Sequence, residues 1–187
     1  MNETQTYKNL KNKPKDNFPE MIIVHHSGGT DANPSEDTSN HTAQIMEAFH
    51  LSKKWEGLGY QYVIHKDGAV WLGRPETYHG AHTVNFNNKS IGICLAGNFD
   101  VTLPTPLQEI SLKSLILDIR GRYPNIGEKI YPHRRFAKKT CYGSRLADNW
   151  VLNLVSSPIP PTIEIKTEKE EVLDILKKAI NIIEKKW

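Results

Sequence analysis

The stretch NKSIGICLAGNF, residues 88–99, constrains the fold of this chain more than any other segment. Its nearly continuous apolar run is typical of a strand buried on both faces at the centre of a sheet. A second apolar run, EMIIVHHS at residues 20–27, predicts another buried strand that ends at His25 and His26. Two such strands indicate a β-sheet as the framework of the fold.

The segments between these strands add a helix and a hairpin. Residues 60–74 alternate apolar side chains around Asp67 and Gly68, which predicts a hairpin whose turn suits glycine. An amphipathic helix precedes the hairpin, with Ser39 or Asn40 as its N-cap. The apolar residues at helical spacing are Ile45, Phe49 and Leu51.

A longer helix is predicted for residues 105–124. Pro106 lies at its start, and Gly121 and Pro124 end it. Its recurring apolar residues are Leu112, Leu115, Ile116 and Ile119. The order strand, helix, hairpin, strand, helix and loop predicts an α/β fold, with a central mixed β-sheet flanked by helices.

The sequence divides into three parts. Residues 1–19 form a polar N-terminal lead-in, residues 20–155 form the main domain, and residues 156–187 combine a proline-rich linker with a C-terminal amphipathic helix. This helix either docks on its own domain or has a role in self-association or targeting. Its apolar stripe contains Val172, Leu176, Ala179, Ile183 and Trp187.

Composition excludes several classes of protein. The chain has 187 residues, of which 38% are hydrophobic and 24% charged, which suits a globular domain with a real core. No apolar run approaches the ~18 residues of a transmembrane helix, and the N-terminus lacks the apolar stretch of a secretory signal. The net charge of +3 is too small to indicate a nucleic-acid partner. Cys94 and Cys141 are expected to be reduced, with Cys94 buried in a strand.

The segment YPHRRFAKKTCYGSRL, residues 131–146, contains two candidate metal ligands. His133 and Cys141 are eight positions apart, and a third ligand has to come from another element. His25, at the end of a predicted strand, would complete a His, His, Cys set, which suits zinc better than magnesium or calcium. The alternatives are a hydrogen-bonded strand histidine and a solvated basic turn.

Four segments resemble a known family when they are taken in order. IIVHHS, GLGYQYVIHKDGAVWLGR, GAHTVNFNNKSIGICLAGNF and PHRRFAKKTC are similar to motifs of the zinc-dependent N-acetylmuramoyl-L-alanine amidases. That family includes the phage lysozyme-type amidases and the peptidoglycan recognition proteins. The resemblance implies a Zn²⁺ ion in a surface groove, with His25, His133 and Cys141 as its ligands. It selects His25 rather than His26, which is expected to be a neighbour of the site.

The resemblance also implies two catalytic residues. Tyr60 matches a tyrosine beside the zinc, and Lys139 matches a lysine of the phage-type enzymes; both can stabilise negative charge on the substrate. Tyr62 is expected to share a face with Tyr60, and Lys138 is adjacent to Lys139, so each is an alternative. No carboxylate in the matched motifs is an obvious general base.

Substrate contacts are predicted for three further residues. His82, in GAH, matches a groove histidine more closely than His79 does. Asn85 and the neighbouring Asn88 either contact the substrate or serve turn chemistry. Arg74 either binds a substrate carboxylate or pairs locally. The family commonly has CPG where this chain has CYG, and Tyr142 in place of proline is expected to loosen the loop slightly.

The implied reaction is hydrolysis of the amide between N-acetylmuramic acid and L-alanine of bacterial peptidoglycan or muropeptides. The absence of a signal peptide suits a phage or prophage endolysin that is made in the cytoplasm and acts on the cell wall after release. A cytosolic enzyme that recycles wall fragments is an alternative. A peptidoglycan-binding receptor or regulator without hydrolysis is the alternative from another class, and Cys141 favours the enzyme. A structural zinc domain would need four protein ligands.

Overall fold

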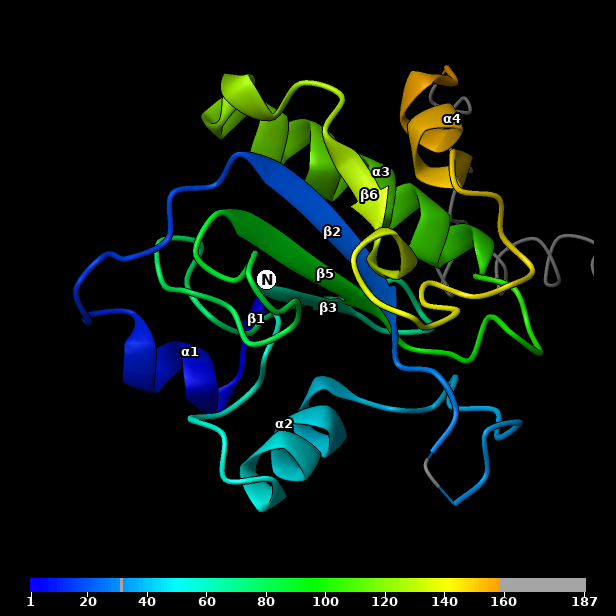
Figure 1. Ribbon diagram of the computed structural model, residues 1–187, viewed down its shortest axis with the longest axis horizontal. Helices are drawn as coiled ribbons and strands as arrows, with labels where there is room; N and C mark the ends of the chain where they lie inside the picture. Colours follow the sequence, from blue (N-terminus) through cyan, green and yellow to red (C-terminus); the bar gives the residue numbers. More distant parts are fainter. Residues whose placement is uncertain (31, 159–187) are drawn as a thin grey trace, which may run out of the picture. The chain divides into compact units, whose positions relative to one another are not determined.

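The computed structural model describes residues 1–30 and 32–158, and residues 1–157 form one compact unit. This unit contains a six-stranded mixed sheet with the strand order β1-β4-β3-β5-β2-β6. Helices α3 and α4 lie on one side of the sheet, and α1 and α2 lie on the other (Figure 1). The predicted α/β fold with a central mixed sheet and flanking helices is therefore confirmed.

The strands are β1 (Asn2–Glu3), β2 (Met21–His26), β3 (Tyr62–Ile64), β4 (Val70–Leu72), β5 (Ser90–Leu95) and β6 (Ile130–Pro132). The helices are α1 (Gln5–Leu10), α2 (Ala43–Ser52), α3 (Pro106–Arg122) and α4 (Trp150–Ser156). Two short 3-10 helices, η1 (Pro124–Ile126) and η2 (His133–Arg135), flank β6.

Strand β5 occupies the centre of the sheet, as its apolar run predicts. It pairs in parallel with β2 on one side and with β3 on the other, and all six of its residues are buried. Strand β2 is also interior, since it pairs with β5 and β6. The hairpin is confirmed as well: β3 and β4 pair antiparallel, and Gly68 in the turn has a φ of +81°.

Helix α3 covers one face of the sheet with its predicted apolar residues. Thr105 is its N-cap and forms a capping box with Gln108, and Pro106 is the first helical residue. Gly121 does not end the helix, which continues to Arg122. A single glycine near the end is tolerated because α3 is held by packing. The core residues that α3 supplies are Leu112, Leu115, Ile116 and Ile119.

Helix α2 differs from its prediction in its cap and in its buried face. Its N-cap is Thr42, whose side chain accepts from the Ile45 backbone N–H, and not Ser39 or Asn40. The residues predicted to be apolar anchors, Ile45, Phe49 and Leu51, are about half exposed, at 48%, 51% and 53%. The residues that α2 buries are Ala43, Met46, Glu47 and His50.

Two polar residues of α2 are buried because long-range hydrogen bonds satisfy them. The carboxylate of Glu47 accepts from the backbone N–H and the hydroxyl of Thr6 in α1. Nδ1 of His50 accepts from the backbone N–H of Gly59 at 3.1 Å. Buried polar groups with partners carry little penalty, so apolar spacing alone misassigned the face.

The N-terminal lead-in is part of the sheet instead of lying outside the domain. Strand β1 pairs in parallel with β4, and helix α1 buries Leu10 and Thr6. Neither element was predicted, because a two-residue strand and a six-residue helix are too short for a periodic pattern. Among the residues that the structure describes, no helix is long and apolar enough to cross a membrane. The predicted C-terminal helix lies outside the described residues.

Candidate metal centre

The two faces of the sheet are covered unequally, and the candidate site lies on the less covered one. Along β2, Ile22 and Val24 point into the large core beneath α3 and α4. His25 points to the opposite face, where the smaller core is built from α2 and includes Cys94, the residue paired with His25 in β5. The end of β2 therefore presents a histidine on the side of the sheet where α2 supplies the core.

A tight loop after β6 brings the other two candidate ligands to His25. His133 opens η2 directly after β6, and the backbone N–H of Arg134 donates to the carbonyl of Cys141 at 2.6 Å. This hydrogen bond closes the loop and brings together the side chains of His133 and Cys141, which are eight residues apart in the sequence. The donor atoms of His25, His133 and Cys141 all lie within 4.8 Å of one another.

The distance between two of the donor atoms matches the one expected around a tetrahedral zinc ion. Nδ1 of His25 is 3.7 Å from Sγ of Cys141. Zinc bonds of ~2.05 Å to nitrogen and ~2.3 Å to sulfur at a tetrahedral angle would separate these atoms by about 3.6 Å. The backbone N–H of His26 also points at Sγ, at 3.4 Å, as expected for a group that stabilises a thiolate.

Burial leaves the three ligands neutral when no cation is present. Burial raises the pKa of the Cys141 thiol to about 12 and lowers the pKa of His133 to about 4. The pKa of His25 is also well below its usual value, first because of burial and then because of His82. Neutral imidazoles are the ligand form, and a divalent cation would favour the thiolate. Among the described residues the cluster has three protein ligands, as a site with an open position requires.

Arg134 and Asp100 hold the loop that carries Cys141. The Arg134 guanidinium pairs with Asp148 and donates to the carbonyls of Gly143 at 2.7 Å and Leu146 at 2.6 Å. Asp100 accepts from the Thr140 hydroxyl at 2.6 Å and from the backbone N–H of Ser144 at 2.6 Å. The sequence offered no signal for either role, since a basic turn and a loop aspartate look ordinary.

Tyr142 tightens this loop, contrary to the expected loosening. Its side chain is 1% exposed, and its hydroxyl lies 3.0 Å from the Ala147 carbonyl and 2.9 Å from the Asp148 carbonyl. Its ring packs edge-on against Trp150 and lies beneath the Arg134 guanidinium. The peptide bond between Cys141 and Tyr142 is cis. Packing of a large ring therefore replaces the constraint that proline would impose.

His26 is a neighbour of the cluster. Its Nδ1 accepts from the backbone N–H of Phe99 at 2.9 Å, and its ring is 6% exposed. Burial lowers the pKa of His26 to about 4. This imidazole anchors the segment after β5, which carries Asp100.

Tyr60 faces the histidines, whereas Tyr62 does not. The Tyr60 ring centroid is 5.1 Å from that of His25. Tyr62 lies in the core beneath α3, and its hydroxyl donates to Glu76 at 2.8 Å. The expected shared face is wrong because residues 60 and 61 precede β3 and do not follow its regular alternation.

Lys139 is an exposed residue close to the ligands. Its positive charge contributes to the lowered pKa of His133 and of His25. Lys138 is also exposed.

His82 contacts the Nε2 side of the His25 ring. Its Nδ1 is 3.1 Å from Nε2 of His25 and 3.0 Å from the Thr83 hydroxyl. Burial lowers the pKa of His82 to about 3. His79 is remote from this contact and pairs with Asp16 at 2.5 Å.

The structure gives Arg74 and Asn85 roles in the fold of the loops around them. Arg74 is 3% exposed, and its guanidinium donates to the carbonyls of Leu58 at 2.7 Å and His79 at 2.9 Å. These contacts are the local pairing that the sequence left as one alternative, and they show that Arg74 supports the fold. Asn85 is exposed and adopts a φ of +66°, a conformation that asparagine tolerates in turns, and Asn88 is also exposed.

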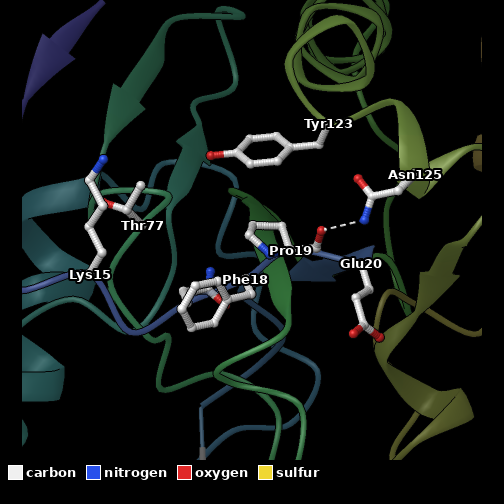
Figure 2. Close-up of a pocket in the computed structure, with 8 residues that line it drawn as sticks. Lys15, Phe18, Pro19, Glu20, Thr77, Tyr123 and Asn125 are labelled. Atoms are coloured by element: carbon white, nitrogen blue, oxygen red, sulfur yellow. Dashed lines mark hydrogen bonds between the residues drawn. The ribbon is translucent and has the colours of Figure 1, made fainter.

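A hollow of about 430 Å³ lies at the other end of the sheet (Figure 2). It surrounds Phe18 and Pro19, which precede the first residue of β2, whereas the metal cluster follows the last residues of that strand. The side-chain amide of Asn125 donates a hydrogen bond to the Pro19 carbonyl at 3.0 Å, which is drawn as a dashed line in Figure 2. The hollow contains none of the cluster residues, so the chemistry has to be sought at the opposite edge.

Fold and site together define a class of α/β proteins that have a mixed sheet and three candidate metal ligands near the end of a central strand. The family model described as N-acetylmuramoyl-L-alanine amidase matches residues 15–144, and the chain belongs to this family. The two cysteines are both free, as predicted.

Individual relatives fall in two groups. The endolysin of Enterobacteria phage T3 is 33% identical over 145 residues, which cover 74% of this chain and 90% of the endolysin. Peptidoglycan-recognition protein SC2 of Drosophila melanogaster is 31% identical over 132 residues, 70% of this chain and 71% of that protein.

Solved structures of both groups share the fold. N-acetylmuramoyl-L-alanine amidase LysC from Clostridium intestinale aligns with a TM-score of 0.63 and 30% identity, over 76% of this chain and 87% of that one. Wild-type Drosophila PGRP-LB aligns with a TM-score of 0.61 and 27% identity, over 81% and 89%. Amidase and endolysin relatives support a peptidoglycan amidase, and recognition proteins are relatives too.

Proposed function

We propose that this protein is a zinc-dependent N-acetylmuramoyl-L-alanine amidase that hydrolyses the amide between N-acetylmuramic acid and L-alanine of peptidoglycan. The observation that carries the proposal is the convergence of His25, His133 and Cys141 at the C-terminal end of β2. Bound zinc would act as a Lewis acid and lower the pKa of water. The family match supplies the substrate class.

Tyr60 would act as a hydrogen-bond donor. Burial raises the pKa of its hydroxyl well above the usual value, so it keeps its proton at neutral pH. A neutral hydroxyl cannot serve as a base, but it can donate to the amide oxygen as negative charge develops there. Its place beside the His25 ring suits that role.

Lys139 would stabilise negative charge from the solvent side. An ammonium group near the ligands can hold a substrate carbonyl or carboxylate by charge. Asn85 remains a candidate substrate contact because its side chain is exposed. The carboxylate of Asp100 accepts from Thr140 and Ser144 and so serves the loop.

A non-catalytic receptor is the second candidate, because recognition proteins are among the relatives. The presence of Cys141 in the cluster favours the enzyme, since a receptor does not need a complete ligand set. A structural zinc domain is disfavoured, because the cluster found in the described part of the chain has three ligands and not four.

The test measures zinc and hydrolysis together. Zinc content is determined by elemental analysis for wild type and Cys141→Ser, and release of L-alanine amino termini is followed on purified peptidoglycan. We expect about one zinc per chain and activity in the wild type, and loss of both in the variant. Wild type that binds zinc but releases no amino termini would support the receptor.

We further propose a phage or prophage endolysin as the biological role. The support is the similarity to the T3 endolysin, of which this chain covers 90%. Expressed inside a bacterium, an endolysin should leave cells intact until the membrane is permeabilised. A recycling enzyme would instead act on soluble muropeptides and leave isolated sacculi undigested.

A further inference from the structure

The His25 ring is held from two sides by different partners. Its Nδ1 faces Sγ of Cys141 at 3.7 Å, and its Nε2 faces Nδ1 of His82 at 3.1 Å. The rings of His25 and His82 meet edge to face, with centroids 5.0 Å apart and planes at 83°. One nitrogen is thus directed at the ligand cluster and the other at an imidazole.

This arrangement determines which nitrogen carries the proton. A ligand histidine binds a metal through its unprotonated nitrogen, so ligation through Nδ1 leaves the proton on Nε2. That N–H needs an acceptor, which in most metal sites is a carboxylate, a backbone carbonyl or water. Nδ1 of His82 lies at the distance and position of such an acceptor.

We propose that His82 is a positioning residue that fixes the tautomer and the ring orientation of the metal ligand His25. The inference rests on the proposed metal site and adds a residue that acts through His25. Second partners of this kind commonly change metal affinity by 10–100-fold when they are removed.

The surroundings of His82 are built to hold its ring in place. A Cβ atom at Gly92, in the central strand β5, would lie 2.5 Å from Cδ2 of His82, and one at Gly80 would lie 2.4 Å from the same atom. Glycine weakens the interior of a strand, so its presence at position 92 indicates a need for space. The ring occupies that space.

Hydrogen bonds fix the backbone of the same segment. The backbone N–H groups of His82 and Thr83 both donate to Oδ1 of Asn87, each at 2.8 Å. The Thr83 hydroxyl lies 3.0 Å from Nδ1 of His82. The imidazole is therefore held from its main chain as well as from its ring.

The surroundings of Nε2, the second ring nitrogen of His82, argue against a role in substrate binding. Nε2 is buried and has no hydrogen-bond partner among the residues that the structure describes. A buried polar atom without a partner is destabilising and calls for a compensating role. With Nδ1 directed at His25 and Nε2 buried, both nitrogens are turned towards the protein.

Two substitutions separate the acceptor from the bulk of the ring. In His82→Asn, Oδ1 takes the place of Nδ1 and can still accept from His25; in His82→Leu, no acceptor remains. Zinc dissociation constants are measured on the full chain by competition with a chromophoric chelator. We expect about 10–100-fold weaker binding for His82→Leu and nearly wild-type binding for His82→Asn.

A spectroscopic readout reports on the ligand geometry without activity. With Co²⁺ in place of zinc, the visible absorption bands should shift in His82→Leu and remain in His82→Asn. The matched control is His79→Leu, in the same segment but paired with Asp16 at the surface, which should leave affinity and spectrum unchanged. Circular dichroism confirms that each variant is folded.

A steric variant keeps the inference testable if His82→Leu does not fold. Gly92→Ala retains the imidazole but displaces it, and it should also weaken zinc binding. Wild-type zinc affinity and an unshifted cobalt spectrum in His82→Leu, or in Gly92→Ala, would overturn the inference, and a raised KM for peptidoglycan would then assign His82 to substrate binding. A wild-type protein that binds no zinc would instead overturn the proposed metal site itself.

Discussion

Arg134 shows how one side chain can organise a functional loop. Its guanidinium bonds to Asp148 and to backbone carbonyls on both sides of Cys141, which no smaller cation could reach together. Arginine suits this role because its donors are arranged in a rigid planar fork. The position of Cys141 is thus set by a residue that does not belong to the ligand cluster.

Replacing Arg134 by lysine should therefore destabilise the protein despite the retained charge. We expect a loss of about 2 kcal/mol in the free energy of unfolding, because several charge-assisted hydrogen bonds are lost. Urea unfolding of wild type and Arg134→Lys measures it. Arg135→Lys, at an exposed neighbour, is the control and should be close to neutral.

His50 should contribute a measurable pH dependence to stability. Its ring is stacked on Trp55 with centroids 4.5 Å apart, and burial lowers its pKa to about 4 from an unfolded value of 6.5. The unfolded chain therefore takes up a proton at His50 before the folded protein does, so its stabilising effect is full above pH 6.5 and is lost as the pH falls towards 4.

The variant His50→Asn isolates this contribution, because Oδ1 of asparagine can still accept from Gly59 but does not titrate. Between pH 7 and pH 4, wild type should lose about 3 kcal/mol more than the variant, and urea unfolding at both pH values measures the difference. Equal losses in the two proteins would contradict the buried, neutral state of His50.

Among the elements, helix α2 is unusual because it buries polar side chains on one face and exposes apolar side chains on the other. Its buried side includes Glu47 and His50, while Ile45 and Phe49 are exposed. The helix is held as much by hydrogen bonds to Thr6 and Gly59 as by apolar packing.

Substitutions on the two faces of α2 should therefore have effects opposite to those expected from apolar spacing. Phe49→Ser, on the exposed face, should change the free energy of unfolding by less than about 1 kcal/mol. Met46→Ala, which removes a side chain that is 6% exposed, should cost about 2–3 kcal/mol. Thermal and urea unfolding of both variants provide the measurement, and a costlier Phe49→Ser would reverse the assignment.

The elements also show which parts of the fold and site are predictable from sequence. Strands β2 and β5, the hairpin and α3 were predicted because each has a long local pattern. The candidate ligands His25, His133 and Cys141 were proposed from their spacing and the family resemblance, and the structure brings them together. The packed face of α2, the separation of Tyr60 from Tyr62 and the position of His82 were not predictable, since each depends on partners far away in the sequence.

At the scale of the whole molecule, the N-terminal segment is an integral part of the body. Strand β1 closes the sheet beside β4, and Thr6 supplies the donors that satisfy the buried Glu47. The family match begins only at residue 15, so comparison alone would suggest that this segment is dispensable.

Deletion of residues 1–10 should accordingly destabilise the remaining domain. It removes buried Leu10 and leaves the Glu47 carboxylate without these donors, at a cost of about 3 kcal/mol or more. The fall in the urea midpoint measures the effect. In a Glu47→Leu background the same deletion should cost less, because no buried carboxylate is left unsatisfied.

The wide separation of His25 and Cys141, 116 residues along the chain, has a consequence for biosynthesis. During translation, the ribosome has to complete nearly the whole body before a third ligand becomes available. A chain that is truncated before residue 141 cannot form the site, whatever the supply of metal. Metal capture at this cluster would therefore report on completed folding of the body, and an incomplete chain would lack the site.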